Sequence, residues 1–146
     1  MEEKLTNKHD FLEVIKRGLS LNDIDAQSYS PLTLAYIGDD AYDLVIRTYL
    51  LSRGNMPVNK INKMANALVK AETQSSMMDV IEPLLDEEEL AVYKRGRNAK
   101  SNTKAKNATV ADYRRATGFE ALMGYLYLKG SYERMVQLIG EAMPEV

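Results

Sequence analysis

The sequence predicts an all-α protein built around a single core. Apolar residues recur every three or four positions through most of the chain, which is the spacing of an amphipathic helix. No segment shows the alternation of apolar and polar residues that is typical of a half-buried strand. The chain has 146 residues, 45% of them hydrophobic, which suffices for one compact domain and leaves little room for a second. We therefore assign residues 1–146 to one domain, with residues 1–28 as its N-terminal extension.

The first half of the chain begins with a short and then a long helix. The short helix is predicted over residues 10–17, and Gly18 ends it. The long helix begins at Pro31, because Ser30 can cap its free N–H groups and proline suits the first position. Gly54 and Pro57 end this helix. Its apolar stripe is predicted to comprise Leu34, Ile37, Ala41, Leu44, Val45, Thr48 and Leu51.

A second long helix is predicted over residues 58–79, with one apolar and one solvated basic face. The apolar face comprises Ile61, Met64, Ala65 and Leu68. The basic face comprises Lys60, Lys63, Lys70 and Gln74.

The second half is predicted to hold three further helices. Asp86 and Glu89 have the spacing of a capping box, and Gly96 ends the helix that they begin. Residues 97–108 are rich in Asn, Lys, Ser and Thr and are predicted to form an exposed loop. The most apolar helix then runs from Thr109 to about residue 128. A final helix after residue 131 is predicted to bury Met135, Leu138, Ile139 and Ala142.

Charge is segregated along the chain, although the net charge is only −2. Residues 94–115 hold eight bases against one acid, so a polyanion would be attracted to one side of the protein and repelled by another. The basic loop has no aromatic residue to stack on bases, which favours contacts to the backbone of a duplex. The alternative is an ordinary solvated surface. The candidates for RNA binding are Lys60, Lys63, Lys70, Arg95, Arg97, Asn98, Lys100 and Arg114.

Asp39 and Glu120 are the two acids that helix patterning does not explain. Asp39 follows Gly38, and a glycine inside a helix costs about 1 kcal/mol relative to alanine, so we expect a backbone or a ligand to approach there closely. Glu120 lies in the most apolar helix, where an ionised carboxylate is costly unless a cation compensates it. Two carboxylates from two helices, together with water, would suit Mg²⁺. The alternatives are a solvated Asp39 and an ion pair between Glu120 and Arg114, Arg115 or a lysine.

Two segments resemble the ribonuclease III family. Residues 34–41, Leu-Ala-Tyr-Ile-Gly-Asp-Asp-Ala, resemble its signature helix. Residues 119–126, Phe-Glu-Ala-Leu-Met-Gly-Tyr-Leu, resemble its second catalytic helix. The resemblance to the shorter Mini-ribonuclease III branch extends from about Pro31 to Ala142 and includes the basic run over residues 94–100 and the pair Tyr113–Arg114.

The resemblance implies a helical bundle of the ribonuclease III catalytic type that forms a homodimer and cleaves double-stranded RNA with Mg²⁺. It implies that Asp39 and Glu120 are the catalytic and metal-binding residues. It also implies a product with a 5'-phosphate and a role in the maturation of the precursor of large-subunit (23S) ribosomal RNA.

The chain departs from the longer enzymes of this family in several ways. Those enzymes carry acids at the positions of Ala35 and Thr117 and a double-stranded RNA-binding domain that this sequence does not show. Thr117 could instead hold a metal-bound water. Asp43, one turn after Asp39, is a weaker supporting candidate, and its alternative role is an ion pair with Arg47.

A two-fold homodimer is also expected on physical grounds, because two sites related by a two-fold axis match the symmetry of an antiparallel duplex. The first long helix carries apolar residues outside its predicted stripe, and these would supply the interface unless the N-terminal segment covers them. They are Leu32, Tyr42, Ile46, Tyr49 and Leu50.

The sequence favours a cytoplasmic protein without a membrane partner. It has no cysteine, no secretory signal and no apolar run near the roughly 20 residues of a membrane span. Two other function classes remain open at this point. A non-catalytic RNA-binding module would need only the basic segment, whereas a helical nucleotide pyrophosphatase would normally show a denser acidic cluster.

Overall fold

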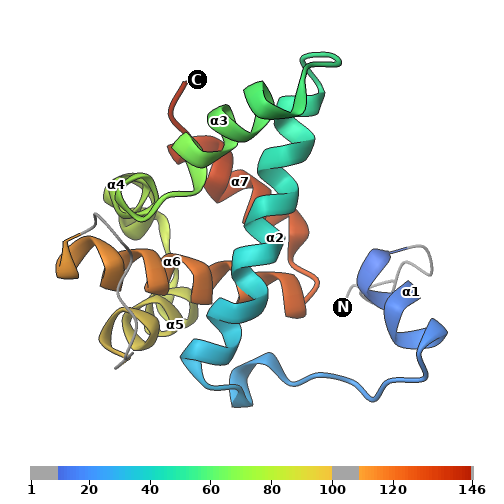
Figure 1. The fold of residues 1–146 in the computed structure, drawn as a ribbon. Helices are drawn as coiled ribbons and strands as arrows, with labels where there is room; N and C mark the ends of the chain where they lie inside the picture. The colour runs from blue at the N-terminus through green and yellow to red at the C-terminus, as the bar shows by residue number, and fades with distance from the viewer. Residues whose placement is uncertain (1–9, 100–108, 146) are drawn as a thin grey trace.

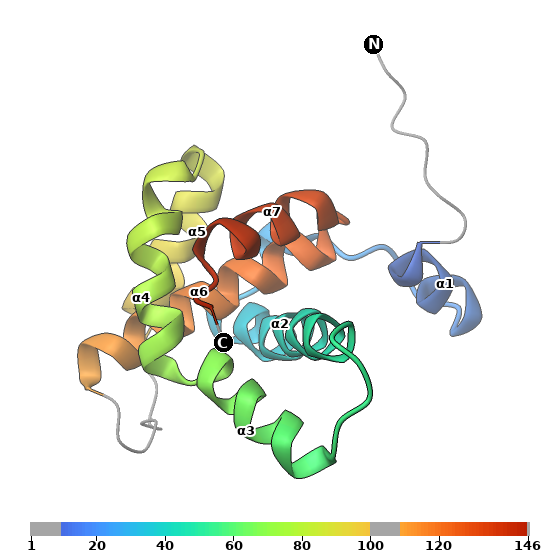
Figure 2. The same cartoon turned by 90° about the horizontal axis from the view of Figure 1, so that it is seen from above.

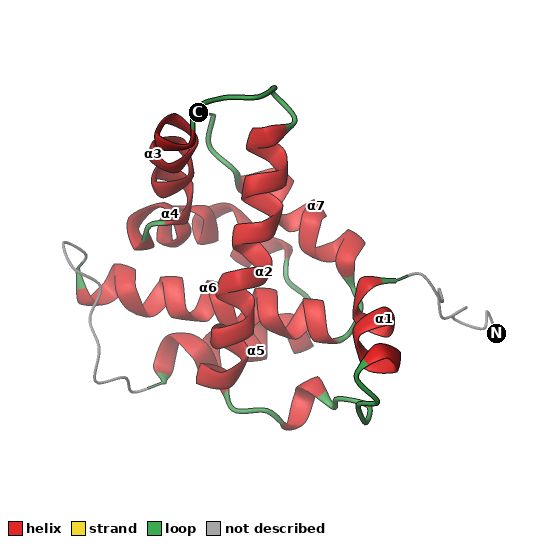
Figure 3. Ribbon diagram, turned by 45° about the vertical axis from the view of Figure 1, so that its right-hand side comes forward, coloured by secondary structure: helices red, strands yellow, loops and turns green. Residues whose placement is uncertain are grey.

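The computed structural model describes residues 10–99 and 109–145, and all regular structure in them is helical (Figures 1 and 3). The prediction of an all-α protein is confirmed. None of these described helices combines the length and the apolarity that a bilayer span needs. The α-helices are α1 (Phe11–Gly18), α2 (Pro31–Leu51), α3 (Val58–Val69), α4 (Ala71–Ile81), α5 (Glu87–Asn98), α6 (Val110–Leu128) and α7 (Tyr132–Ala142), with short 3-10 helices at Ala26–Ser28 and Glu82–Leu84.

Helix α6 is the centre of the molecule. Eleven of its 19 residues are buried, because α2, α4, α5 and α7 all pack against it. Figure 1 shows α2 crossing in front of α6, and Figure 2 shows the same pair with α2 viewed nearly along its axis. Burial on several sides explains why α6 is the most apolar segment of the sequence.

The predicted helix over residues 58–79 is wrong, since the structure has two helices that meet at Lys70. The backbone of Lys70 is extended, with a ψ of 156°. A continuous helix would use the carbonyls of residues 67 and 68 for its own hydrogen bonds. Instead, the Thr73 hydroxyl donates to the Ala67 carbonyl at 2.6 Å and the Tyr42 hydroxyl donates to the Leu68 carbonyl at 2.8 Å. These two hydroxyls satisfy the free carbonyls at the C-terminal end of α3. The chain can therefore change direction at Lys70, and α3 packs on α2 while α4 packs on α6.

The change of direction at Lys70 also overturns one predicted position. Gln74 was expected on the solvated basic face, but it is 1% exposed and points from α4 into the core. The apolar face predicted for this region is confirmed for α3, where Ala65 and Leu68 are buried and Ile61 and Met64 are partly buried.

The predicted apolar stripe of α2 is largely wrong. Of its members only Leu34 is fully buried, whereas Leu44 is 58% and Leu51 is 56% exposed. The helix is apolar on several faces, so periodicity does not select the inner one; close packing of small residues against α6 does. The buried residues of α2 are Leu34, Ala35, Gly38, Tyr42, Ile46 and Leu50.

Helix starts were predicted more accurately than helix ends. Ser30 caps α2 through its hydroxyl, and Asp86 and Glu89 form the predicted capping box at the start of α5. Gly96, however, does not end α5, which continues to Asn98. An added Cβ at Gly96 would lie 2.9 Å from the Cα of Gly118 in α6, so this glycine serves helix packing.

The capping glutamate also ties α7 to the start of α5. Glu89 is 5% exposed and receives two hydrogen bonds from Arg134, each of 2.9 Å, from Nε and Nη2. These hydrogen bonds are the main cause that lowers the pKa of the Glu89 carboxyl. The C-terminal helix is thereby fixed to the body, with Met135, Leu138 and Ile139 buried as predicted.

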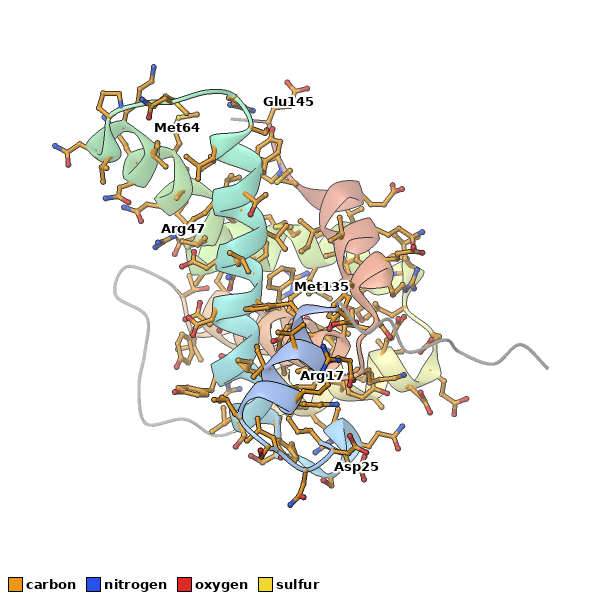
Figure 4. All side chains as sticks on the ribbon, turned by 90° about the vertical axis from the view of Figure 1, so that its right-hand side faces the viewer. Arg17, Asp25, Arg47, Met64, Met135 and Glu145 are labelled. Carbon is orange, nitrogen blue, oxygen red and sulfur yellow. The ribbon has the colours of Figure 1, made fainter. Side chains whose placement is uncertain are left out.

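Helix α1 lies at the edge of the molecule, on the side that faces the viewer in Figure 4, where Arg17 is labelled. Its contact with the body is made near its start, where Asp10 accepts a hydrogen bond from the Tyr132 hydroxyl and Leu12 is buried. Phe11 remains 61% exposed, so α1 covers only a small part of the apolar surface of α2.

Candidate active site

The backbones of α2 and α6 touch at Gly38 and Gly124. A Cβ at Gly38 would lie 1.7 Å from the carbonyl oxygen of Glu120, and a Cβ at Gly124 would lie 1.9 Å from the carbonyl oxygen of Leu34. Only residues without a side chain allow this approach. The close approach of a backbone at Gly38 is therefore confirmed.

The crossing brings Asp39 and Glu120 together although 81 positions separate them in the sequence. Asp39 follows Gly38 and is exposed, while Glu120 is partly buried. Burial, followed by the negative charge of Asp39, raises the pKa of the Glu120 carboxyl to about 8. The two carboxyl groups thus share one site in which two negative charges are costly.

The donor set of this site fits a divalent cation such as Mg²⁺. Among the described residues, no group of three His, Cys, Asp or Glu side chains could hold a metal, so the chain offers a pair of carboxylates. Mg²⁺ commonly binds one or two carboxylates and takes its remaining ligands from water and substrate phosphates. The alternative pairing of Glu120 with Arg115 is not seen, because Arg115 pairs with Asp79 at 2.6 Å.

Thr117 lies one turn before Glu120 on α6, and Asp43 lies one turn after Asp39 on α2. Thr117 is 8% exposed, and its hydroxyl donates to the carbonyl of Tyr113 at 3.0 Å. Asp43 forms an ion pair of 3.4 Å with Arg47, which is the alternative role considered for it. Because the Thr117 hydroxyl already donates its hydrogen to Tyr113, it can only accept a hydrogen bond from a further partner.

Gln74 is the neighbour of this site that the sequence analysis missed. Its buried amide faces Glu120 and lowers the pKa of that carboxyl, against the larger effects of burial and of Asp39. The available signal was a glutamine at the position where the apolar repeat of Met77, Met78 and Ile81 calls for an apolar residue.

The predicted RNA-binding residues fall into two groups, one on and just after α3 and one where α5 ends and α6 begins (Figure 1). One group lies on and just after α3, where Lys60, Lys63 and Lys70 are exposed. The other lies where α5 ends and α6 begins. It comprises Arg95, Arg97, Asn98 and Arg114, while Lys100 lies outside the described residues.

Two of the arginines in the second group also make contacts within the protein. Arg95 donates from Nη2 to the carbonyl of Tyr29 at 3.2 Å, and Arg97 lies 5.6 Å from the centre of the Tyr93 ring. Residues 97 and 98 belong to α5, so the predicted loop begins later than expected. The end of α5 thus presents its basic groups from a helix.

Residues 32–131 of the chain match the ribonuclease III domain. The Mini-ribonuclease 3 of Clostridium tetani is 50% identical over 79% of this chain and 77% of its own length. The Mini-ribonuclease 3 of Brevibacillus brevis is 47% identical over 81% of this chain and 88% of its own length. A crystal structure of a protein from Fusobacterium nucleatum superposes with a TM-score of 0.72 at 38% identity, covering 80% of this chain and 89% of that one.

Proposed function

Because the chain belongs to the ribonuclease III family, in its Mini-ribonuclease III branch, we propose that it hydrolyses RNA at the Asp39–Glu120 pair with Mg²⁺ as cofactor. It is an endoribonuclease that acts on double-stranded RNA. One observation carries the assignment of the site: a glycine crossing of two helices holds two carboxylates together, and burial and the neighbouring Asp39 disfavour the charged form of Glu120. A bound divalent cation offsets that cost.

Asp39 and Glu120 would hold Mg²⁺ directly or through water. The ion supplies Lewis acidity, which activates a water molecule and stabilises charge on the attacked phosphate. Asp39 is the more exposed of the two acids and therefore meets the incoming phosphodiester, while Glu120 is anchored in α6. Departure of the 3'-oxygen would leave a 5'-phosphate on the product. The Thr117 hydroxyl, which donates to Tyr113, can accept a hydrogen bond from a water molecule at the site.

The direct test is incubation of the protein with structured precursor of 23S ribosomal RNA, with and without Mg²⁺, followed by mapping of the new ends. We expect cuts within duplex regions only when Mg²⁺ is present, with 5'-phosphate and 3'-hydroxyl ends. Binding of the duplex without any cut would favour the non-catalytic RNA-binding module. Hydrolysis of free nucleoside triphosphates in place of RNA would favour the nucleotide pyrophosphatase.

We expect the basic end of α5 to bind the phosphate backbone. Replacing Arg95, Arg97 and Lys100 by alanine should weaken binding about equally for duplexes of different sequence, because interactions with phosphates carry no sequence information. The slope of log K against log salt should flatten by up to about 0.9 for each phosphate that the variant no longer neutralises. Filter binding in Ca²⁺ over a range of KCl concentrations measures this slope.

The matched control for this triple variant is Arg17→Ala, which removes a base from α1. It should leave the salt slope unchanged, because α1 lies on another side of the molecule (Figure 3). A thermal melt of the triple variant is also needed to show that it is folded, since the Arg95 side chain donates a hydrogen bond to the Tyr29 carbonyl ahead of α2. An unchanged salt slope in a folded triple variant would indicate that these basic residues form an ordinary solvated surface and do not bind RNA.

We further propose that the protein acts as a two-fold homodimer through α2. Of the residues first considered for the interface, Tyr42, Ile46 and Leu50 are fully buried within one chain. Leu32, from the same set, is 41% exposed. Of the stripe predicted to face inward, Leu44 is 58% and Leu51 is 56% exposed, and Tyr36, about two turns before Leu44 on α2, is 79% exposed. Leu44 and Val45 also line two apolar grooves, one toward α1 and one toward α7. Exposed apolar surface of this kind is typical of an interface.

If the protein acts as a dimer, the number of active sites in the dimer should decide whether one or both strands of a duplex are cut. A heterodimer of one unchanged and one Asp39→Asn subunit should nick one strand, because each site addresses one phosphodiester at a time. Native gels with end-labelled strands distinguish nicks from double-strand cuts, and sedimentation gives the mass under the same conditions. A monomer that makes double-strand cuts in a single encounter would refute the dimer.

A further inference from the structure

Two polar residues of α4 are buried beside its apolar ones, Gln74 and Ser75, and the Ser75 hydroxyl donates to Asp112 at 2.7 Å. Positions 74, 77, 78 and 81 follow helical spacing and are all buried, and the last three are Met77, Met78 and Ile81. Gln74 occupies the first position and is 1% exposed. A buried amide without a partner loses its hydration without compensation, so packing alone would favour an apolar side chain here.

The amide nitrogen of Gln74 has no hydrogen-bond partner of ordinary geometry among the described residues. Among the described residues, the Tyr93 hydroxyl is the other buried side-chain group without such a partner, and it lies near Arg115. The inner face of α4, which carries Gln74, packs against α6, which carries Glu120, and the Gln74 side chain is one of the groups that interact with the Glu120 carboxyl. A carboxylate is the natural acceptor for such a donor, because a charged acceptor gives a stronger hydrogen bond.

We propose that Gln74 is a positioning residue that donates its amide N–H to one carboxylate oxygen of Glu120 and leaves the other oxygen for the cation shared with Asp39. This inference rests on the proposed active site. The position of Gln74 depends on the break at Lys70, since α4 begins one turn before it at Ala71. The hydrogen bonds that end α3 therefore also place this amide beside Glu120.

A hydrogen bond of this kind changes how well Glu120 holds a cation, and it leaves the RNA surface untouched. Outer partners of metal ligands typically contribute about 10–100-fold to metal affinity or activity. The variant Gln74→Leu removes the donor at similar volume and places an apolar residue on the apolar face of α4. We expect its Mn²⁺ dissociation constant to rise about 10-fold and its kcat to fall about 10–100-fold. We expect KM and the affinity for duplex in Ca²⁺ to stay within about twofold, because the groups that bind phosphate are unchanged.

Mn²⁺ binding followed by electron paramagnetic resonance is the primary measurement, because it needs no RNA. Met78→Leu is the matched control, since it alters the same buried face without a polar group, and it should leave Mn²⁺ affinity unchanged. If Gln74→Leu does not fold, Gln74→Met serves in its place, because methionine adapts to irregular space. Unchanged Mn²⁺ affinity in a folded Gln74 variant would overturn the inference, as would an equal loss in Met78→Leu.

The outcome is separable from that of the proposed function. A chain that binds Mn²⁺ through Asp39 and Glu120 but cuts no duplex would refute the nuclease proposal, and the role of Gln74 would still be decided by Mn²⁺ affinity. A chain that cuts duplex equally well with leucine at position 74 would refute the positioning role alone.

Discussion

Asp39→Asn and Glu120→Gln should each abolish cleavage of duplex RNA while the fold and most RNA binding persist. Both substitutions remove a charge that would hold Mg²⁺ and keep the side-chain volume nearly constant. Metal-derived stabilisation of the transition state is worth several kcal/mol, so the rate should fall by about 10³-fold or more. Single-turnover cleavage at saturating Mg²⁺ measures this loss.

Asp40→Asn is the matched control, because Asp40 is exposed on α2 directly beside Asp39. It should retain cleavage within a few fold of the unchanged protein, since Asp39 and not Asp40 is the α2 acid that interacts with Glu120. Turnover by Asp39→Asn or Glu120→Gln comparable with that of Asp40→Asn would place the catalytic centre elsewhere.

Thermal stability separates lost chemistry from lost folding in these variants. Burial and Asp39 raise the pKa of Glu120 to about 8 from an ordinary value of 4.5. A carboxyl whose pKa is raised on folding costs stability as the pH rises from the unfolded value through the folded one. Without metal, Glu120→Gln should therefore melt at or above the temperature of the unchanged protein at pH 8. A large fall in its melting temperature would instead indicate a structural role for Glu120.

The features that sequence predicted correctly are those with local causes. The cap by Ser30 and the box formed by Asp86 and Glu89 each depend on residues within one helical turn. Glu120 also stood out locally, because a carboxylate within an apolar helix needs a compensating partner. The pairing of Asp39 with Glu120 was implied by a family resemblance, and the glycine crossing supplies its geometry.

The features that sequence predicted wrongly have causes that lie far along the chain. The break at Lys70 is stabilised by Tyr42, which is 26 positions from the carbonyl that it caps. Once the helix turns there, Gln74 leaves the solvated face and enters the core. Periodicity within residues 58–79 cannot reveal a hydrogen bond from α2. The error in the helix boundary and the error in the position of Gln74 therefore have the same origin.

The inner face of α2 has a similar explanation. Its residues are apolar on more than one side, and the choice among those sides depends on where α6 approaches. The approach is set by Gly38 and Gly124, whose backbones meet. Glycine has no hydrophobicity that a periodicity argument would count, so the stripe was assigned to the wrong side. The same error assigned Leu44 and Leu51 to the core and left Tyr42 and Ile46 outside it.

Gly38→Ala should cause the largest loss of stability of the glycine-to-alanine substitutions in this protein. The new Cβ would lie 1.7 Å from the backbone oxygen of Glu120, and a backbone atom cannot move aside as a side chain can. The two helices must then separate, and overpacking in a core costs about 1–3 kcal/mol, with larger values when the backbone must shift. We expect a loss of about 3 kcal/mol or more, which is roughly 10 °C in melting temperature for a domain of this size.

Gly140→Ala is the matched control, because Gly140 lies within α7 and a Cβ there would have nothing within 4 Å. Alanine is the better helix former, so this variant should gain about 0.5–1 kcal/mol. Urea unfolding of both variants compares the two glycines directly. A folded fraction of Gly38→Ala should also cut RNA poorly, since separating α2 from α6 moves Asp39 away from Glu120. If Gly38→Ala kept the stability and the cleavage rate of the unchanged protein, the close contact of α2 and α6 at Gly38 would not be what brings Asp39 and Glu120 together.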